Sequence, residues 1–226
     1  MSETNGNHDG EPGESGCENR TGRSEARLAG EMTTLIDRTA NWELTPTGIP
    51  GCLKVHFPAR PDERGLFVKT FQASAFLNSG LETEFTEMFY TVSGRDVLRG
   101  MHLQLPPADH AKLVYCVEGS VADVVLDLRR GSPTYGKHAV IELAAEMPTG
   151  VYLPRGVAHG FQVRSAPAIL VYQVTSEYSS HLESGVSWDS FGAVWPVADP
   201  VISPRDQTLP RLADFESPFT FSEITW

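Results

Sequence analysis

The chain has 226 residues, of which 40% are hydrophobic and 21% charged, and this composition is typical of a globular protein with one buried core. The formal net charge of −11 argues against a nucleic-acid partner, because neutralising phosphates requires a basic face. No stretch reaches the roughly 18 apolar residues of a membrane span, and the polar N-terminus lacks the pattern of a secretory signal. Three scattered cysteines fit neither a disulfide framework nor a zinc site, so we expect a reduced, cytoplasmic setting.

Residues 1–40 differ in composition from the rest of the chain. They carry eight acidic and four basic residues among Gly, Asn and Ser, with few large apolar side chains. Such a segment buries too little surface to offset the conformational entropy lost on ordering. We therefore expect a disordered tail at 1–40 and a single folded domain at 41–226.

From about Cys52 onward, short segments rich in Val, Leu, Tyr and Phe alternate with Gly and Pro, as in a sandwich or barrel. One helix is predicted at Ala73–Asn78, and turns at Glu118-Gly119-Ser120 and Arg130-Gly131-Ser132-Pro133. An antiparallel double-sheet jelly roll is the favoured all-β architecture, with an up-and-down barrel as the alternative. The predicted strands are Leu66–Phe71, Met88–Val92, Val97–Gln104, Lys112–Val117, Val121–Leu128, Ala139–Leu143, Gly150–Leu153, Gly160–Val163 and Ala168–Thr175.

The strand at Val97–Gln104 carries a candidate catalytic histidine. Side chains alternate along a strand, so Leu98, Gly100, His102 and Gln104 are predicted to share one face. Gly100 leaves space beside His102, and such space suits a ligand. Taken alone, a core histidine that is hydrogen-bonded to a neighbour fits the same pattern.

Two further residues stand out, and each also has a purely structural explanation. His159 lies between Gly156 and Gly160, where a turn enters a strand, and such a pattern can mark only a tight turn. Tyr172 is predicted to share a strand face with small apolar residues, as an ordinary core tyrosine does. A metal site is not expected, because neither His102 nor His159 has a second histidine two positions away.

Taken together, the motifs resemble the dTDP-4-dehydrorhamnose 3,5-epimerase family, a branch of the cupin-type jelly rolls. The resemblance extends over roughly residues 52 to 215 and depends on the order and spacing of several motifs. These are Glu63-Arg64-Gly65-Leu66-Phe67, Leu98 to Gln104, Ala111-Lys112-Leu113-Val114, Asp123 to Gly136, Pro154 to Phe161, Leu170-Val171-Tyr172 and Ser203-Pro204-Arg205-Asp206.

The resemblance implies a role for each matching residue. His102 falls on the family's catalytic base, Asp206 on the carboxylate that orients it, and Tyr172 on the general acid. Lys112 and His159 fall on residues that line the sugar pocket. The remaining implied substrate-binding positions are Arg64, Arg99, Gln104 and Arg205. A homodimer is likewise implied by the resemblance alone.

The chemistry that the family performs agrees with these residue types. A ketone at C4 of a hexose acidifies the hydrogens on C3 and C5, and histidine is suited to remove such a proton near neutral pH. A carboxylate on the other ring nitrogen fixes the histidine tautomer. Lys112 can hold the enolate oxygen, and Tyr172 can protonate the opposite face. The reaction needs no redox cofactor, and the sequence has no glycine-rich dinucleotide motif.

Two positions depart from the family pattern, and both border the nucleotide in the family. Lys69 stands where rhamnose-pathway members carry glutamate, and Glu87-Met88-Phe89 stands where Gln-x-Asn is common. The sequence therefore leaves open a nucleotide other than thymidine, or a longer sugar. Two alternatives to an epimerase remain at this point: a nucleotide-sugar ketoisomerase of the same fold, and a non-catalytic nucleotide-sugar-binding cupin.

Overall fold

The computed structural model describes residues 41–222, so the tail predicted at 1–40 lies outside the described residues. Within them, the one α-helix, α2 (Ala73–Asn78), has the predicted bounds, and none of the helices has the length and apolarity needed to span a membrane. Two 3₁₀ helices, η1 (Asp206–Thr208) and η2 (Leu212–Asp214), follow near the C-terminal end. The strands are β1 (Glu43–Pro46), β2 (Leu53–His56), β3 (Ala59–Asp62), β4 (Gly65–Val68), β5 (Glu87–Ser93), β6 (Leu98–Gln104), β7 (Lys112–Asp127), β8 (His138–Ala144), β9 (Thr149–Leu153), β10 (Val157–Val174) and β11 (Glu183–Gly185).

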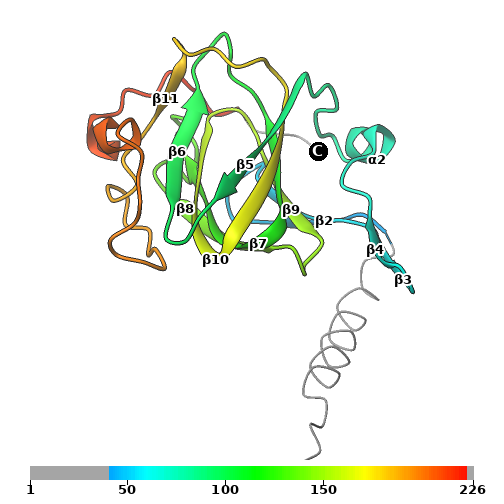
Figure 1. Cartoon of the computed structure of the whole chain (residues 1–226). Helices are drawn as coiled ribbons and strands as arrows, with labels where there is room; N and C mark the ends of the chain where they lie inside the picture. Colours follow the sequence, from blue (N-terminus) through cyan, green and yellow to red (C-terminus); the bar gives the residue numbers. More distant parts are fainter. Residues whose placement is uncertain (1–40, 223–226) are drawn as a thin grey trace, which may run out of the picture.

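Two long antiparallel strands, β7 and β10, organise the fold (Figure 1). The second half of β7 and the first half of β10 join β8, β6 and β11 in one sheet. The first half of β7 and the second half of β10 join β9, β2, β1 and β5 in another. Strands adjacent in space are mostly not adjacent in sequence, which excludes an up-and-down barrel and confirms the predicted double-sheet jelly roll.

The continuity of β7 and β10 corrects two predictions. Glu118-Gly119-Ser120 is not a turn between strands, because β7 runs through it without reversing. Gly119 has φ +69°, and β10 has two extra residues opposite this point, between Ser165 and Ile169. A glycine and a bulge therefore bend the strand pair from one sheet into the other. The strands predicted at Gly160–Val163 and Ala168–Thr175 are likewise the two halves of β10.

The main core fills the space between the two sheets. It combines Val121, Val125 and Phe161 from one sheet with Val114 and Leu170 from the other. Along the second half of β10, alternate residues point into this core, and Tyr172 shares that buried face with its apolar neighbours as predicted. The burial of large apolar side chains from both sheets stabilises their face-to-face packing.

Two parts lie at the periphery of the sheets. The β3–β4 hairpin forms a separate two-stranded sheet beside α2, at the edge of the molecule in Figure 1. At the opposite side, the segment that carries η1 and η2 packs next to β6 and β11 (Figure 1). A short bridge between Val97 and Val201 ties this C-terminal segment to the start of β6. The C-terminal segment thereby reaches the strand that carries His102.

Candidate active site

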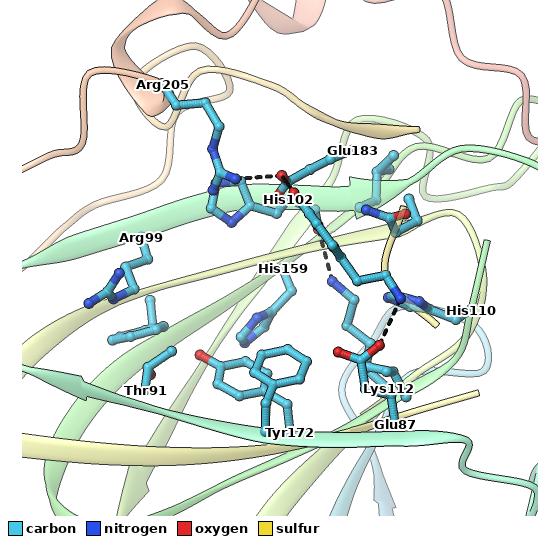
Figure 2. A pocket seen from close by; sticks show the side chains of 16 residues that line it. Glu87, Thr91, Arg99, His102, His110, Lys112, His159, Tyr172, Glu183 and Arg205 are labelled. Carbon is cyan, nitrogen blue, oxygen red and sulfur yellow. Dashed lines mark hydrogen bonds and ion pairs between the residues drawn. The ribbon is translucent and has the colours of Figure 1, made fainter. Parts of the chain in front are cut away.

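A cavity of about 320 Å³ opens between β5 and β6, which pair with different halves of β10. Side chains from β5, β6, β7, β10 and β11 line it, together with residues of the loops that follow β6 and β10 and of the segment before η1. Figure 2 shows His102 and Tyr172 on opposite sides of the cavity, with His159 and Lys112 between them. The cavity therefore collects side chains from strands that are far apart in the sequence.

An irregularity in β6 places Arg99 and His102 on the same wall. Residues three apart in a regular strand point to opposite faces, yet both side chains line the cavity. Opposite them on β10, Phe161 pairs with Arg99 and His159 with His102, so β6 has one extra residue here. Gly100 lies in this bulge with φ +123°, and a Cβ there would meet the His159 carbonyl oxygen at 2.8 Å. The predicted face shared by Leu98, Gly100 and His102 is therefore broken at the bulge.

His102 forms a pair with Asp206, which comes from the first position of η1. His102 Nε2 lies 2.8 Å from Asp206 Oδ1, and the second carboxylate oxygen accepts a 3.1 Å hydrogen bond from the Gly100 N–H. Arg205 Nη2 also lies 3.2 Å from Nε2, but the carboxylate contact is shorter and a carboxylate only accepts hydrogen bonds, so we assign the proton to Nε2 and the lone pair to Nδ1. The His102 side chain is 22% exposed and Asp206 only 2%, so the base faces the cavity and its orienting partner is buried.

Charge and hydrogen bonding hold Asp206 ionised. Burial raises the pKa of this carboxyl, but the hydrogen bond and charge of His102, the Gly100 N–H and Ser203 together bring the pKa well below its ordinary value. Arg205 adds positive charge, with its Nε 3.3 Å from Asp206 Oδ1. An ionised Asp206 stabilises an imidazolium at His102, as the carboxylate of a catalytic triad does.

Lys112 begins β7 and reaches the cavity floor. Its Nζ donates to the His102 carbonyl oxygen over 3.3 Å. Burial lowers the pKa of Lys112 to about 8, against the opposing charges of Glu183 and Asp123. The side chain is therefore mostly an ammonium at pH 7, and it can donate a hydrogen bond to a ligand oxygen.

Tyr172 is fixed by ring stacking and burial. Its ring stacks on Phe89 of β5 with centroids 4.8 Å apart and planes 9° apart, and the His159 ring meets it edge-on at 5.9 Å. Burial raises the pKa of the phenol above its ordinary value near 10. Tyr172 therefore retains its proton at neutral pH and can act as a proton donor.

A second histidine–aspartate pair lies behind the cavity. His159 Nε2 is 2.7 Å from Asp123 Oδ2, and the two side chains are 5% and 0% exposed. The other oxygen, Asp123 Oδ1, is buried without a hydrogen-bond partner among residues 41–222. The pair joins β10 to β7 and fixes the orientation of the His159 ring at the cavity wall.

The cavity rim is polar and interconnected. The Tyr178 hydroxyl donates to Glu183 Oε2 over 2.7 Å, and Arg205 pairs with the same carboxylate over 2.5 Å (Figure 2). Glu87 Oε2 accepts a 2.7 Å hydrogen bond from the Tyr178 backbone N–H, and Gln104 Oε1 accepts one of 3.1 Å from the backbone of Ser179. These contacts hold the loop after β10 against β5 and β6.

The structure brings most of the sequence-predicted site residues together, but not all. Arg64 lies in the β3–β4 turn, where it pairs with Asp62 and is 85% exposed. Lys69 is exposed and donates to Gln72 over 3.4 Å. Neither lines the cavity of its own chain, so the departure at Lys69 does not alter this cavity. The predicted residues that do line the cavity or directly contact those that do are His102, Asp206, Tyr172, Lys112, Arg99, Gln104, His159, Arg205 and Glu87.

Sequence reasoning missed several cavity residues. Thr91 shares one face of β5 with Glu87 and Phe89, so the period of the strand could have indicated it. Tyr178 and Glu183 lie in a loop and a three-residue strand without a local signal. The remaining missed residue with a polar side chain is His110, just before β7. Within residues 41–222, no three His, Cys, Asp or Glu side chains converge as metal ligands would.

Comparison with known proteins gives concordant matches. A family model described as dTDP-4-dehydrorhamnose 3,5-epimerase matches residues 46–214. The dTDP-4-dehydrorhamnose 3,5-epimerase of Shigella flexneri is 40% identical over 171 residues, covering 74% of this chain and 94% of that protein. The dTDP-4-dehydrorhamnose 3-epimerase of Streptomyces niveus is 38% identical over 174 residues, covering 76% and 84%. The crystal structure of a dTDP-6-deoxy-D-glucose-3,5-epimerase from Legionella pneumophila, in complex with dTDP-4-keto-L-rhamnose, matches with a TM-score of 0.77 and 30% identity, over 80% of this chain and 100% of that one.

Proposed function

Because the chain belongs to the dTDP-4-dehydrorhamnose 3,5-epimerase family, we propose that its cavity epimerises a dTDP-linked 4-keto-6-deoxyhexose at C3, C5 or both. The product serves deoxysugar biosynthesis, and the protein is an isomerase. One observation carries the assignment: an oriented base, a buried ammonium and a protonated phenol surround a single cavity. These are the groups that proton removal, enolate stabilisation and proton return require.

His102 starts the reaction. Its Nδ1 lone pair takes the proton from the carbon next to the ketone, and the C–H electrons move into the C4 carbonyl to form an enolate. The resulting imidazolium is stabilised by Asp206, 2.8 Å from Nε2. The Lys112 ammonium then donates to the C4 oxygen as negative charge develops there. Its lowered pKa of about 8 leaves it charged at neutral pH.

Tyr172 completes the inversion from the opposite side. Its phenol proton passes to the carbanion carbon on the face away from His102, and the C4 carbonyl re-forms. The opposite placement of His102 and Tyr172 in Figure 2 supports this division of roles. Protonation by His102 on the original face returns the substrate with a solvent-derived hydrogen, so exchange and inversion are separable events.

The remaining cavity residues hold the substrate. Arg99 and Arg205 supply positive charge for the diphosphate, and Arg205 must exchange its contact with Glu183 for a phosphate oxygen. Gln104, His159 and Glu87 contact the sugar or the nucleoside. We assign thymidine as the base on the strength of the family.

Incubation in deuterium oxide tests the proposed function. The protein is mixed with dTDP-4-keto-6-deoxyglucose, and with the UDP and GDP analogues, and the ring carbons are followed by NMR. We expect deuterium at C3, at C5 or at both, inverted configuration there, and an unmoved ketone. A displaced ketone, or no exchange with any nucleotide, would contradict an epimerase. The pattern of labelled carbons also distinguishes one inversion from two.

A homodimer fits two features of the surface. Within residues 41–222, β5 pairs with β10 alone, and Met88, Tyr90 and Val92 on it are 67%, 67% and 56% exposed. An apolar edge strand of this kind is normally covered. A neighbouring subunit would also give Arg64 a substrate to bind, because Arg64 lies outside its own cavity. Sedimentation at micromolar concentration should give twice the 24.8 kDa of the chain, and a monomer alone would refute the dimer.

A further inference from the structure

His110 is a cavity residue that takes no part in the proposed proton transfers. It lies in the loop between β6 and β7, two residues before Lys112, and its side chain lines the cavity. Figure 2 shows it on the same side of the cavity as Lys112 and across from Arg99. His110 Nδ1 lies 2.9 Å from the Ser176 hydroxyl, in the loop after β10.

The Ser176 contact fixes which nitrogen of His110 carries the proton. Ser176 Oγ lies 2.6 Å from the Ala108 carbonyl oxygen, and a carbonyl only accepts hydrogen bonds. The single hydroxyl hydrogen is therefore used on Ala108. Ser176 Oγ must accept from His110, so the proton of His110 is on Nδ1. The other ring nitrogen, Nε2, is left as a lone pair that makes no hydrogen bond to any residue in 41–222.

The surroundings of His110 keep the ring neutral. Burial, followed by the positive charges of Lys112 and Arg155, lowers the pKa of His110 to about 3. Arg155 itself forms ion pairs with Glu82 and Asp109. Near neutral pH the cavity lining thus combines His110, whose Nε2 is an acceptor, with Lys112 two residues later, whose ammonium is a donor, and Figure 2 shows the two side chains on one side of the cavity. A ligand that satisfies both residues needs an acceptor for the Lys112 ammonium and a donor for His110 Nε2.

We propose that His110 is a specificity-determining residue that accepts a hydrogen bond from the C3 hydroxyl of the substrate sugar. The assignment rests on the proposed function, in which Lys112 holds the C4 oxygen. The two neighbours of C4 are C3, which carries a hydroxyl, and C5, which carries a methyl group. Of these two substituents, the hydroxyl alone can donate a hydrogen bond. A 4-keto sugar with its C3 hydroxyl therefore matches the Lys112–His110 pair, and one without it leaves Nε2 unpaired.

Two substrates and four variants, one of them a control, test the role of His110. The substrates are dTDP-4-keto-6-deoxyglucose and dTDP-4-keto-3,6-dideoxyglucose, and the readout is kcat/KM for deuterium incorporation next to the ketone. His110→Phe keeps a ring but removes the acceptor, and it should lower kcat/KM about tenfold for the hydroxylated substrate. His110→Gln restores an acceptor and should recover most of that loss. On the 3-deoxy substrate, wild type and both variants should agree within about threefold.

Ser176→Ala provides a variant that leaves His110 in place. Without the Ser176 hydroxyl, the proton of His110 is no longer held on Nδ1. We therefore expect a smaller loss of kcat/KM, again confined to the hydroxylated substrate. His56→Phe is the matched control: this histidine also contacts a hydroxyl, Thr45 Oγ1 at 3.3 Å, but lies on β2 outside the cavity. The control should match wild type on both substrates. Equal losses on the two substrates, or none on either for His110→Phe and Ser176→Ala, would overturn the proposal. Failure of the wild-type protein to exchange either substrate would instead refute the proposed function.

Discussion

The two histidine–aspartate pairs have nearly the same contact distance but differ in how the carboxylate is used. Both oxygens of Asp206 accept, one from His102 and one from the Gly100 N–H, and His102 is 22% exposed at the cavity. Asp123 uses one oxygen on His159, leaves the other without a partner, and the whole pair is buried. The first pair can therefore exchange a proton with a ligand in the cavity. The second holds a ring in place between two strands.

The largest expected effects come from replacing the histidine of each pair, because only one of the two histidines is the catalytic base. His102→Ala deletes the base, so we expect solvent deuterium incorporation to fall by roughly 10²–10⁴-fold at every ring position. His159→Ala leaves the base intact and should retain measurable exchange, while it loses stability through the cavity that it creates. NMR-detected exchange and thermal unfolding measure the two effects. Exchange by the His102 variant at the wild-type rate would show that the base is another group.

The corresponding aspartate variants separate orientation from packing. Both oxygens of Asp206 accept hydrogen bonds, so in Asp206→Asn the amide NH₂ must face one of the two donors. If the amide oxygen keeps the Gly100 N–H, the NH₂ faces His102 Nε2, which must then give up its proton and take the other tautomer. We expect a rate loss on the order of 100-fold with an unchanged fold. Asp123→Asn can place its NH₂ at the unpartnered position and keep its oxygen on His159. Its kcat should fall less than tenfold, with a destabilisation of at most about 3 kcal/mol. Similar rate losses in the two variants would remove the distinction.

Tyr172→Phe tests the group opposite the first pair. The ring and its stacking on Phe89 are kept, and the phenol proton is lost. Epimer formation should fall by on the order of 100-fold, while His102 continues to exchange solvent deuterium on the original face. The ratio of inversion to exchange, measured in one NMR time course, reports this change. Undiminished inversion would assign the far-face proton to water or another residue.

The pH profile should show the smallest effect. Burial lowers the pKa of Lys112 to about 8, so the ammonium that stabilises the enolate is present below that pH and is lost as pH rises through it. We expect kcat to fall by at most about tenfold between pH 8 and pH 9. In Lys112→Met the rate at pH 7 should be low and this alkaline decline should be absent. An unchanged alkaline decline in that variant would attribute it to another group.

The sequence predicted the local elements better than their connection. Ala73–Asn78 was bounded correctly because a short amphipathic helix depends on nearby residues. The long strands β7 and β10 were predicted as four, because Gly119 marks a bend as readily as a reversal, and only pairing with the neighbouring strand decides between them. Their shared curvature is a tertiary property, set by the two sheets packing on each other.

The site shows the same limit. His102 could be identified within one motif, but its partner Asp206 came from the family resemblance and not from any local pattern. The contact of Asp123 with His159 depends on the register between β7 and β10, and the place of Arg99 in the cavity depends on the bulge in β6. Alternation along a single strand reveals neither. His110 had no signal of its own, since its role as an acceptor follows from a serine 66 positions later in the chain.

The division of the cavity between long and short elements has a consequence for how the site becomes competent. Lys112, His159 and Tyr172 stand on β7 and β10, each of which is hydrogen-bonded on both sides, so these groups stay in register whenever the sheets are intact. Asp206 instead stands on a three-residue helix near the end of the chain. If only the C-terminal segment detached, Lys112 and Tyr172 would stay in place. His102 would lose the Asp206 contact that fixes its tautomer. We therefore expect amide hydrogen exchange around η1 to open at a lower free energy than exchange in β7 and β10.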